Sequence, residues 1–238
     1  MARLKARLIY SNSLTAVNDV RYGCGFVAPD PVLLIILAKK QILVVSTMEQ
    51  GRAKRECYSS VEVLTPEELL LPPKKRWDIV EQIQAVAARV GIKTVEVGFD
   101  FPAGIYTKLM EKGWKVQLSP RSNYPTRRTK NQQEIEYIRN SQRAAVAGMK
   151  EAVARIASAD IGSRGALRDS QGVLTSERVR EAVQLELLKR GCSGRDIIVA
   201  GGDQATDPHE RGSGPLFAGE AIIVDIFPRN ETTGYWGE

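Results

Sequence analysis

The stretch IIVAGGDQATDPHERGSGPLFAGEAIIVDIFPRNETTGYWGE, residues 197–238, decides how the second half of the chain folds. It holds two short aliphatic runs separated by a glycine-rich loop, and such runs between turn residues are typical of buried strands. Asp225 lies inside the second run. Burying a carboxylate among aliphatic neighbours is costly unless it is paired or binds a cation. Asp225 is therefore a candidate metal ligand, with a hydrogen-bonded structural aspartate as the alternative.

A turn follows Asp225. The segment PRNETTG, residues 228–234, is rich in turn formers, so residues 221–227 and 235–238 are expected to form a hairpin. If the centre of the hairpin lies midway through the loop, position 225 faces position 238, and directly opposed residues have Cβ atoms roughly 4.5–5.5 Å apart. Asp225 and Glu238 would then be neighbours that could share a cation. Metals bridged by such carboxylates activate a water for hydrolysis.

His209 lies in the loop sequence DPHERG and is the chain's single histidine. A lone loop histidine is most often a surface residue, but near a metal it could hydrogen-bond a substrate or carry a proton. No site that needs several imidazole ligands can be built from this chain alone. The loop glycines do not match a phosphate-binding GxGxxG, which disfavours a nucleotide site.

The first half of the chain alternates strand and helix signals, which predicts an α/β fold with a partly parallel sheet covered by helices. The aliphatic runs before residue 50 predict a hairpin around Lys39–Gln41. A helix with apolar residues at helical spacing is expected to end at Gly91, and a second is expected to begin at Pro102. The expected strands are Leu8–Tyr10, Val32–Ala38, Ile42–Thr47, Thr94–Val97 and Lys115–Leu118.

A polar, basic and proline-broken stretch from Ser119 to Lys130 predicts a domain boundary, with domains at 1–125 and 126–238. This stretch is interpreted as a solvated linker, with phosphate contact as the alternative. A long helix then begins at Asn131, which forms a capping-box pattern with Glu134. Its apolar stripe is expected to pack in the core. The stripe consists of Ile135, Ile138, Val146, Met149, Val153 and Ile156.

A further helix is expected to begin at Thr175 or Ser176 and to end at Gly191. Its inward face is expected to consist of Val179, Ala182, Val183 and Leu187.

Composition is that of a globular protein. The 238 residues are 43% apolar and 26% charged, and the net charge of +6 is only a weak indication of an acidic partner such as nucleic acid. Cys24, Cys57 and Cys192 are scattered and form no CxxC pair, which argues against a disulfide framework or a cysteine zinc site and favours a reducing cytoplasm. The strongest apolar run, from Val32 to Ala38, is too short to span a membrane.

The run at residues 207–238 resembles the middle of Xaa-Pro dipeptidases and aminopeptidases, in the metallopeptidase family that also contains creatinase and methionine aminopeptidase. IYSNSLTAVNDVRYGCGFVAPDP (9–31) and VVSTMEQGRAKRE (44–56) resemble that family's N-terminal domain. RRTKNQQEIEYIR (127–139) resembles its first catalytic helix. The resemblance implies a creatinase-like N-terminal domain with a mixed sheet, followed by the first half of a pita-bread α+β domain.

By resemblance, the expected activity is cleavage of the bond between a residue and a following proline by two divalent metal ions, commonly manganese, cobalt or zinc. Asp225 is similar to the first metal-ligand aspartate, Glu238 falls at the place of the second, and His209 at that of a substrate-side histidine. The partners implied are a proline-containing peptide and further copies of the chain.

Two departures make the enzymatic activity uncertain. Position 238 is Glu where the family has Asp, and one extra methylene could spoil chelation. The family's metal-ligand histidine and two glutamates come from the second half of the catalytic domain, so the 238-residue chain is expected to be inactive by itself. The alternative is a non-catalytic dimerising or peptide-binding module of the same fold. In either case the apolar edge near the C-terminus predicts self-association or fraying.

Overall fold

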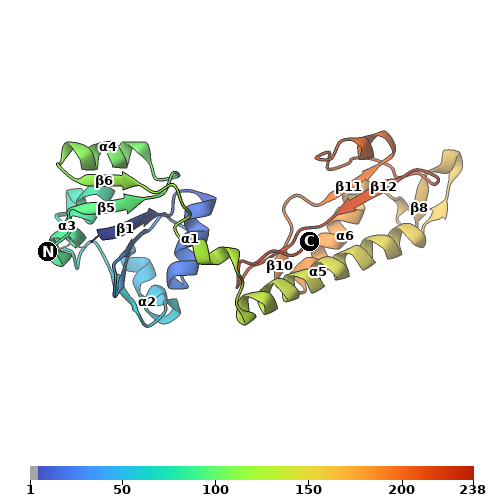
Figure 1. Ribbon diagram of the computed structural model, residues 1–238. Coiled ribbons are helices and arrows are strands. Elements are labelled where there is room, and N and C mark those ends of the chain that lie inside the picture. Colours follow the sequence, from blue (N-terminus) through green and yellow to red (C-terminus); the bar gives the residue numbers. More distant parts are fainter. Residues whose placement is uncertain (1–4) are drawn as a thin grey trace. The chain divides into compact units, whose positions relative to one another are not determined.

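The computed structural model describes residues 5–238, which divide between Arg128 and Thr129 into two compact units (Figure 1). Each unit has its own hydrophobic core. Within the described residues, no helix is both long and apolar enough to cross a membrane.

The first unit is built on a six-stranded mixed sheet with strand order β4-β3-β2-β1-β5-β6 (Figure 1). The β1–β2 and β2–β3 pairs are antiparallel, whereas β3–β4, β1–β5 and β5–β6 are parallel. This arrangement confirms the predicted mixed sheet, and the pairing of Ile36 with Gln41 confirms the hairpin. The strands are β1 (Lys5–Tyr10), β2 (Leu33–Ile36), β3 (Gln41–Val44), β4 (Val61–Leu64), β5 (Thr94–Val97) and β6 (Lys115–Leu118).

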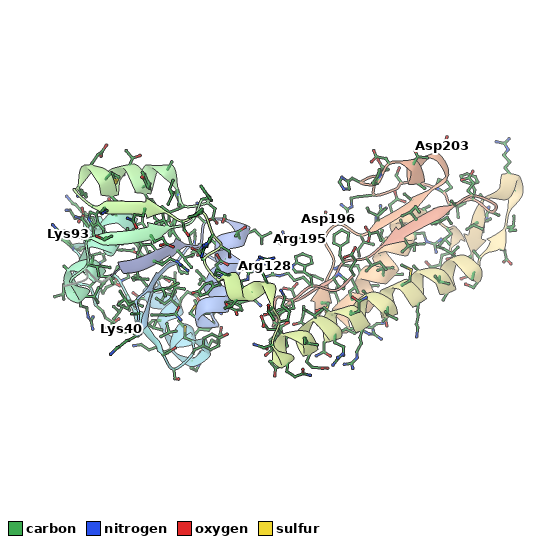
Figure 2. The ribbon with its side chains drawn as sticks, in the orientation of Figure 1. Lys40, Lys93, Arg128, Arg195, Asp196 and Asp203 are labelled. Carbon is green, nitrogen blue, oxygen red and sulfur yellow. The ribbon has the colours of Figure 1, made fainter. Side chains whose placement is uncertain are left out.

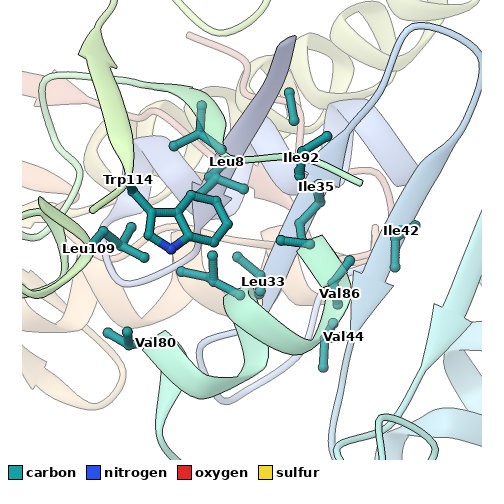
Figure 3. Close-up of a cluster of buried hydrophobic side chains, with 14 of the residues drawn as sticks. Leu8, Leu33, Ile35, Ile42, Val44, Val80, Val86, Ile92, Leu109 and Trp114 are labelled. Atoms are coloured by element: carbon teal, nitrogen blue, oxygen red, sulfur yellow. The ribbon is translucent and has the colours of Figure 1, made fainter. Parts of the chain in front are cut away.

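Helices cover both faces of this sheet. The predicted helices α3 (Ile79–Val90) and α4 (Ala103–Glu111) pack on one face, where Val86 and Leu109 meet alternate strand residues such as Leu33 (Figure 3). The other face carries α1 (Leu14–Cys24) and α2 (Thr47–Glu56), and its core includes Leu34 and the α1 residue Val20. Side chains alternate between the faces of a strand, so β2 contributes to both cores.

Helices α1 (Leu14–Cys24) and α2 (Thr47–Glu56) were not predicted, and Thr47 begins a helix rather than ending a strand. The Ser13 hydroxyl accepts from the Ala16 amide at 3.0 Å and so begins α1 as an N-cap. Gly25 ends it in a left-handed conformation with φ of 82°.

The basic stretch before the second unit is folded onto α1 and is not a free linker. Asp19 of α1 is only 1% exposed, and its carboxylate accepts from Asn123 at 2.8 Å and forms an ion pair with Arg127. A Cβ atom at Gly23 would lie 1.9 Å from the Tyr124 hydroxyl oxygen, so a larger residue here would displace the Tyr124 ring from its place against α1.

The second unit begins with α5 (Gln132–Ala157), which carries the predicted capping box of Asn131 and Glu134. It packs on α6 (Ser176–Leu188), which is capped by Thr175 and buries the predicted residues Val179, Ala182, Val183 and Leu187. The small strands form three sheets, in the orders β7-β8-β9, β10-β13 and β11-β12. They are β7 (Asp160–Ile161), β8 (Leu167–Asp169), β9 (Gly172–Val173), β10 (Cys192–Ser193), β11 (Ile198–Gly201), β12 (Ile222–Asp225) and β13 (Arg229–Asn230).

The prediction that the apolar stripe of α5 lies in the core is wrong for four of its six residues, whereas Ile156 packs against the second unit's core. Val146 is 46% exposed and Val153 is 54% exposed, and Ile135 and Met149 are also exposed. The buried face carries small residues instead: Ser141, Ala144, Ala145, Gly148 and Ala152. A Cβ at Gly148 would lie 3.1 Å from the Val183 side chain. Small residues allow the two helices to approach closely, and helical spacing alone cannot tell which face a neighbour occupies.

We expect Asp19→Ala to lower the free energy of unfolding of the first unit by about 2–3 kcal/mol. The substitution removes charge-assisted hydrogen bonds and leaves the buried Asn123 amide without its acceptor. Urea denaturation followed by circular dichroism measures the change. Asp30→Ala is the matched control, since Asp30 is exposed. Equal stability of the two variants would contradict this account.

Candidate functional site

The two aliphatic runs of the C-terminal stretch form an antiparallel pair, as their composition predicts. Ile198 of β11 pairs with Asp225 of β12, and Gly201 pairs with Ile222. On the other edge of β11, the Val199 amide donates to the Arg211 carbonyl at 3.1 Å. Strand β11 is therefore hydrogen-bonded on both edges, by β12 and by the returning loop that carries His209.

Gly212 allows the loop to approach β11 this closely. Its φ is 79°, and a Cβ atom there would lie 1.8 Å from the Val199 carbonyl oxygen. Any side chain would collide with backbone, so the loop could not return along this path with another residue at position 212.

Side chains of α6 hold the same loop. Nη1 of Arg180 donates to the carbonyl oxygens of Arg211 and Gly212 at 2.5 and 2.6 Å, and the Glu177 carboxylate accepts from the Gly214 amide at 3.1 Å. The Arg180 side chain is 16% exposed. Burial lowers the pKa of Arg180 from its usual value, and the Glu177 charge opposes this shift.

The 3₁₀ turn η4 (Gly202–Thr206) is joined to the returning strand of the loop through one amide side chain. Gln204 accepts from the Ser213 amide at 2.7 Å and donates to the Ser213 carbonyl at 3.1 Å. Figure 2 shows Asp203 at the upper side of the second unit, and the residue is exposed. The loop is thus ordered by side chains on both sides of it.

His209 lies in this loop and is exposed. Its main-chain amide donates to the Asp207 side chain at 3.1 Å, which fixes the backbone just before the histidine. Its imidazole makes no hydrogen bond or ion pair with the residues that the structure describes. Its role as a substrate-side group stays a prediction.

Asp225 ends β12 and is half-buried. Its carboxylate has no hydrogen-bond or ion-pair partner among residues 5–238. The structural alternative, in which protein donors satisfy the carboxylate, therefore finds no support within the described residues. An unpaired carboxylate that is partly withdrawn from water is suited to a cation.

The chain turns back after Asp225 as predicted, but the predicted register is wrong by two residues. Arg229 pairs with Trp236, and continuing this ladder places Phe227 opposite Glu238. Asp225 is then a diagonal rather than a direct neighbour of Glu238, and diagonal neighbours in regular antiparallel sheet are roughly 7–8 Å apart. The assignment of either carboxylate as a metal ligand stays a prediction.

Asn230 explains the shift in register. Its side-chain oxygen accepts from the amides of Thr232 and Thr233 at 3.1 and 2.8 Å, and this Asx turn moves the hairpin's centre one residue along the chain. The returning segment is then held on α5. The Ser141 hydroxyl donates to the Tyr235 carbonyl at 2.9 Å.

Glu238 is positioned by its backbone. The Gln142 side chain accepts from the Glu238 amide at 2.9 Å and donates to its carbonyl oxygen, while residue 238 itself is exposed. The described residues include no group of three or more histidine, cysteine, aspartate or glutamate side chains that could hold a metal ion. The donor set therefore fits one or two ligands of a carboxylate metal site and does not fit a complete dinuclear centre.

Sequence reasoning missed the residues that position this site, chiefly Arg180, Asn230 and Gln142. Arg180 and Glu177 are three residues apart on α6, and this spacing predicts that their side chains lie on the same face of the helix. Nothing in the sequence connects them to a loop more than thirty residues later. The sequence predicted that Asn230 lies in a turn, but it did not predict how Asn230 sets the register of the hairpin.

Comparisons with known proteins show the family and the fold of the chain. A family model described as the creatinase/prolidase N-terminal domain matches residues 2–127, more than half of the chain. No curated protein matches by sequence.

Solved structures with the same fold include those of Xaa-Pro peptidases. The chain is similar to an X-Pro aminopeptidase from Thermotoga maritima (18% identity, TM-score 0.73), with 95% of this chain and 62% of that chain covered. A prolidase from Pyrococcus furiosus is 16% identical with a TM-score of 0.72, and the match covers 94% of this chain and 62% of that chain. A Xaa-Pro dipeptidase from Bacillus anthracis is 14% identical with a TM-score of 0.70, and the match covers 95% of this chain and 59% of that chain.

The chain thus spans about 60% of the length of these structures and has their N-terminal domain and part of their catalytic domain. The family match over residues 2–127 and the shared fold over nearly all of the chain lead to one assignment: the chain belongs to the creatinase/prolidase N-terminal domain family.

Proposed function

We propose that this chain forms the first part of a metal-dependent Xaa-Pro peptidase site, in which Asp225 binds a divalent cation. The observation that carries the proposal is the half-buried Asp225 carboxylate, which has no partner among the described residues and lies at the end of a strand paired on β11. The structural relatives, which are prolidases and Xaa-Pro aminopeptidases, support the choice of substrate.

In this proposal a bound metal pair supplies an activated water for hydrolysis. Asp225 contributes a charged oxygen ligand from a rigid strand, and Glu238 contributes a second carboxylate from the returning segment. His209 lies on the loop along the opposite edge of β11, where a neutral imidazole can accept or donate a hydrogen bond to a peptide. Manganese, cobalt and zinc are the proposed metals, and the cytoplasm is the proposed compartment.

The alternative is a non-catalytic module that binds peptides or assembles with other chains. The exposed stripe of α5 favours this reading. Together with Arg190, one face of that helix lines a groove of about 730 Å³. Its lining residues are aliphatic or cationic apart from Gln142, and none of them is a carboxylate. The groove is lined by Ile135, Ile138, Arg139, Gln142, Arg143, Val146, Ala147, Lys150 and Arg190.

We expect these 238 residues alone to release no proline from Ala-Pro with added manganese or cobalt, because two carboxylates do not complete a metal pair. In a polypeptide that also carries the remaining catalytic domain found in the relatives, we expect hydrolysis that falls at least about a hundredfold in Asp225→Asn.

Asp203→Asn is the matched control, because Asp203 is an exposed aspartate on the neighbouring turn (Figure 2). Release of proline is measured after removal and re-addition of metal. Activity that survives Asp225→Asn would remove Asp225 from the site. The absence of activity in the completed polypeptide, with each of the three metals, would favour the binding module.

We also expect Arg180→Ala to loosen the loop that carries His209, because Arg180 holds the carbonyl groups of Arg211 and Gly212. Amide hydrogen exchange over residues 203–213 should rise at least about tenfold, since local opening follows the loss of these bonds. Arg178→Ala is the control: Arg178 lies on the same helix but contacts Asp169 and the Val173 carbonyl. An equal rise in both variants would show general destabilisation of α6 instead.

Homo-oligomer formation is a further part of the proposal, and the exposed α5 stripe is the expected contact. Replacing Val146 and Val153 together by Ser should shift the chain toward monomer in light scattering after gel filtration, because apolar burial drives such contacts. Ile161→Ser is the control, since Ile161 is 70% exposed on the β7 strand. A wild-type chain that is monomeric at all concentrations would contradict the expectation.

A further inference from the structure

Two cysteines that are far apart in sequence meet in the core beneath one face of the first unit's sheet. Cys24 is the last residue of α1, and Cys57 directly follows α2. The Tyr58 amide donates to the Cys24 carbonyl at 3.0 Å, which brings the backbone at Cys57 beside Cys24. The Cys24 thiol donates to the Val20 carbonyl at 3.1 Å. Both side chains belong to the same hydrophobic cluster.

The backbone after Cys24 is packed closely against the residues on either side of Cys57. Gly25 adopts a φ of 82°, and a Cβ atom there would lie 3.1 Å from both the Glu56 carbonyl oxygen and the Tyr58 ring. The backbones therefore touch on either side of the thiol pair. Disulfide formation requires Cβ atoms about 3.5–4.5 Å apart, and neighbouring thiols on close-packed backbones reach this separation with little movement.

The two thiols differ in environment. Cys24 is fully buried, whereas Cys57 is partly exposed. The neighbouring Cys24 thiol lowers the pKa of Cys57, against an opposing effect of burial. The neighbouring Cys57 thiol and burial raise the pKa of Cys24. Cys57 is therefore the thiol that a solvent-borne oxidant can reach, and Cys24 is the shielded partner, which is the division of roles in reactive dithiols.

We propose that Cys24 and Cys57 form a redox-active dithiol site that a hydroperoxide converts into an intramolecular disulfide and that a small thiol restores. The proposed peptidase function does not require this dithiol site. Both cysteines belong to the first unit. The substrate class on the oxidising side is a hydroperoxide such as hydrogen peroxide, and on the reducing side a thiol such as glutathione.

The chemistry balances without a further reactant. The Cys57 thiolate attacks one peroxide oxygen, the O–O bond breaks, and the departing hydroxide takes a proton to become water. Cys57 is then a sulfenic acid. The Cys24 thiol loses its proton as its sulfur attacks the Cys57 sulfur, the S–O bond breaks, and the second hydroxide leaves as water with that proton. Two thiols are oxidised by two electrons, and one peroxide is reduced to two waters.

The disulfide would join the C-terminal ends of α1 and α2 and close residues 24–57 into a covalent loop. Cross-linking a loop of this size stabilises a fold chiefly by restricting the unfolded chain. We therefore expect oxidation to raise the Tm of the first unit by several degrees and reduction to reverse the change.

Cys192 provides an internal control. It lies in the second unit, is buried, and its thiol is in contact with the Asn230 side chain at 3.8 Å. Burial raises the pKa of Cys192. It should therefore be less reactive than Cys57 and have no resolving partner.

The test is to treat the chain with hydrogen peroxide, block the remaining thiols with an alkylating reagent, and analyse the digest by mass spectrometry without reduction. We expect peptides containing Cys24 and Cys57 to be linked with a loss of two hydrogen atoms, and Cys192 to be alkylated. Dithiothreitol should return both thiols. At pH 7.5 the alkylation rate of Cys57 in the untreated chain should exceed that of Cys192 at least about tenfold.

Matched variants separate this pair from general oxidation. Cys57→Ser should abolish the linked peptides and the rise in Tm, whereas Cys192→Ser should leave both unchanged. Because Cys24→Ser could unfold the core, Cys24→Ala is examined beside it, and in a folded variant Cys57 should accumulate as sulfenic or sulfinic acid. Progression of Cys57 to sulfinic acid in the wild-type chain without a disulfide would overturn the proposal, as would preferential oxidation of Cys192.

Discussion

The backbone of β11 is hydrogen-bonded on both edges, and the positions of the candidate site residues follow from this constraint. One edge fixes β12 and hence Asp225, and the other fixes the returning loop and hence His209. The arrangement depends on Gly212, the one residue type that can lie against the Val199 carbonyl, and on Arg180, which holds the loop from α6. Buried backbone groups must find hydrogen-bond partners. A loop that left this path would leave backbone groups on one edge of β11 without such partners.

Local signals in the sequence predicted most of the elements and failed where the deciding contacts are distant. The strands of the first unit and the caps at Asn131 and Gly91 depend on a few adjacent residues. Helix α1 was missed because its sequence, LTAVNDVRYGC, has few large apolar residues and carries a charged residue at a position that becomes buried. Asp19 is one of these, and it is tolerated inside only because Asn123 and Arg127, about a hundred residues away, satisfy it.

The same limit explains the errors in the second unit. Helical spacing correctly placed the α5 aliphatic residues on one face, but the face that packs on α6 is set by Gly148 and its alanine neighbours. The turn formers after Asp225 predicted the hairpin. Its register, however, depends on which amides donate hydrogen bonds to the Asn230 side chain. A one-residue shift of a turn centre moves every opposed pair by two residues, so register was the weakest part of the site prediction.

Asp19 and Asp225 show how a structural carboxylate differs from a candidate functional one in the same chain. Asp19 is almost fully buried and accepts from an amide and a guanidinium, so its charge is compensated within the fold. Asp225 is half-buried on a strand that the fold holds rigidly, yet no donor among the described residues compensates it. Folding stability alone would favour an apolar residue or a paired aspartate at position 225. Its unpaired carboxylate is accounted for if the compensating charge is a ligand, and carboxylate oxygens are ligands that divalent cations such as manganese bind.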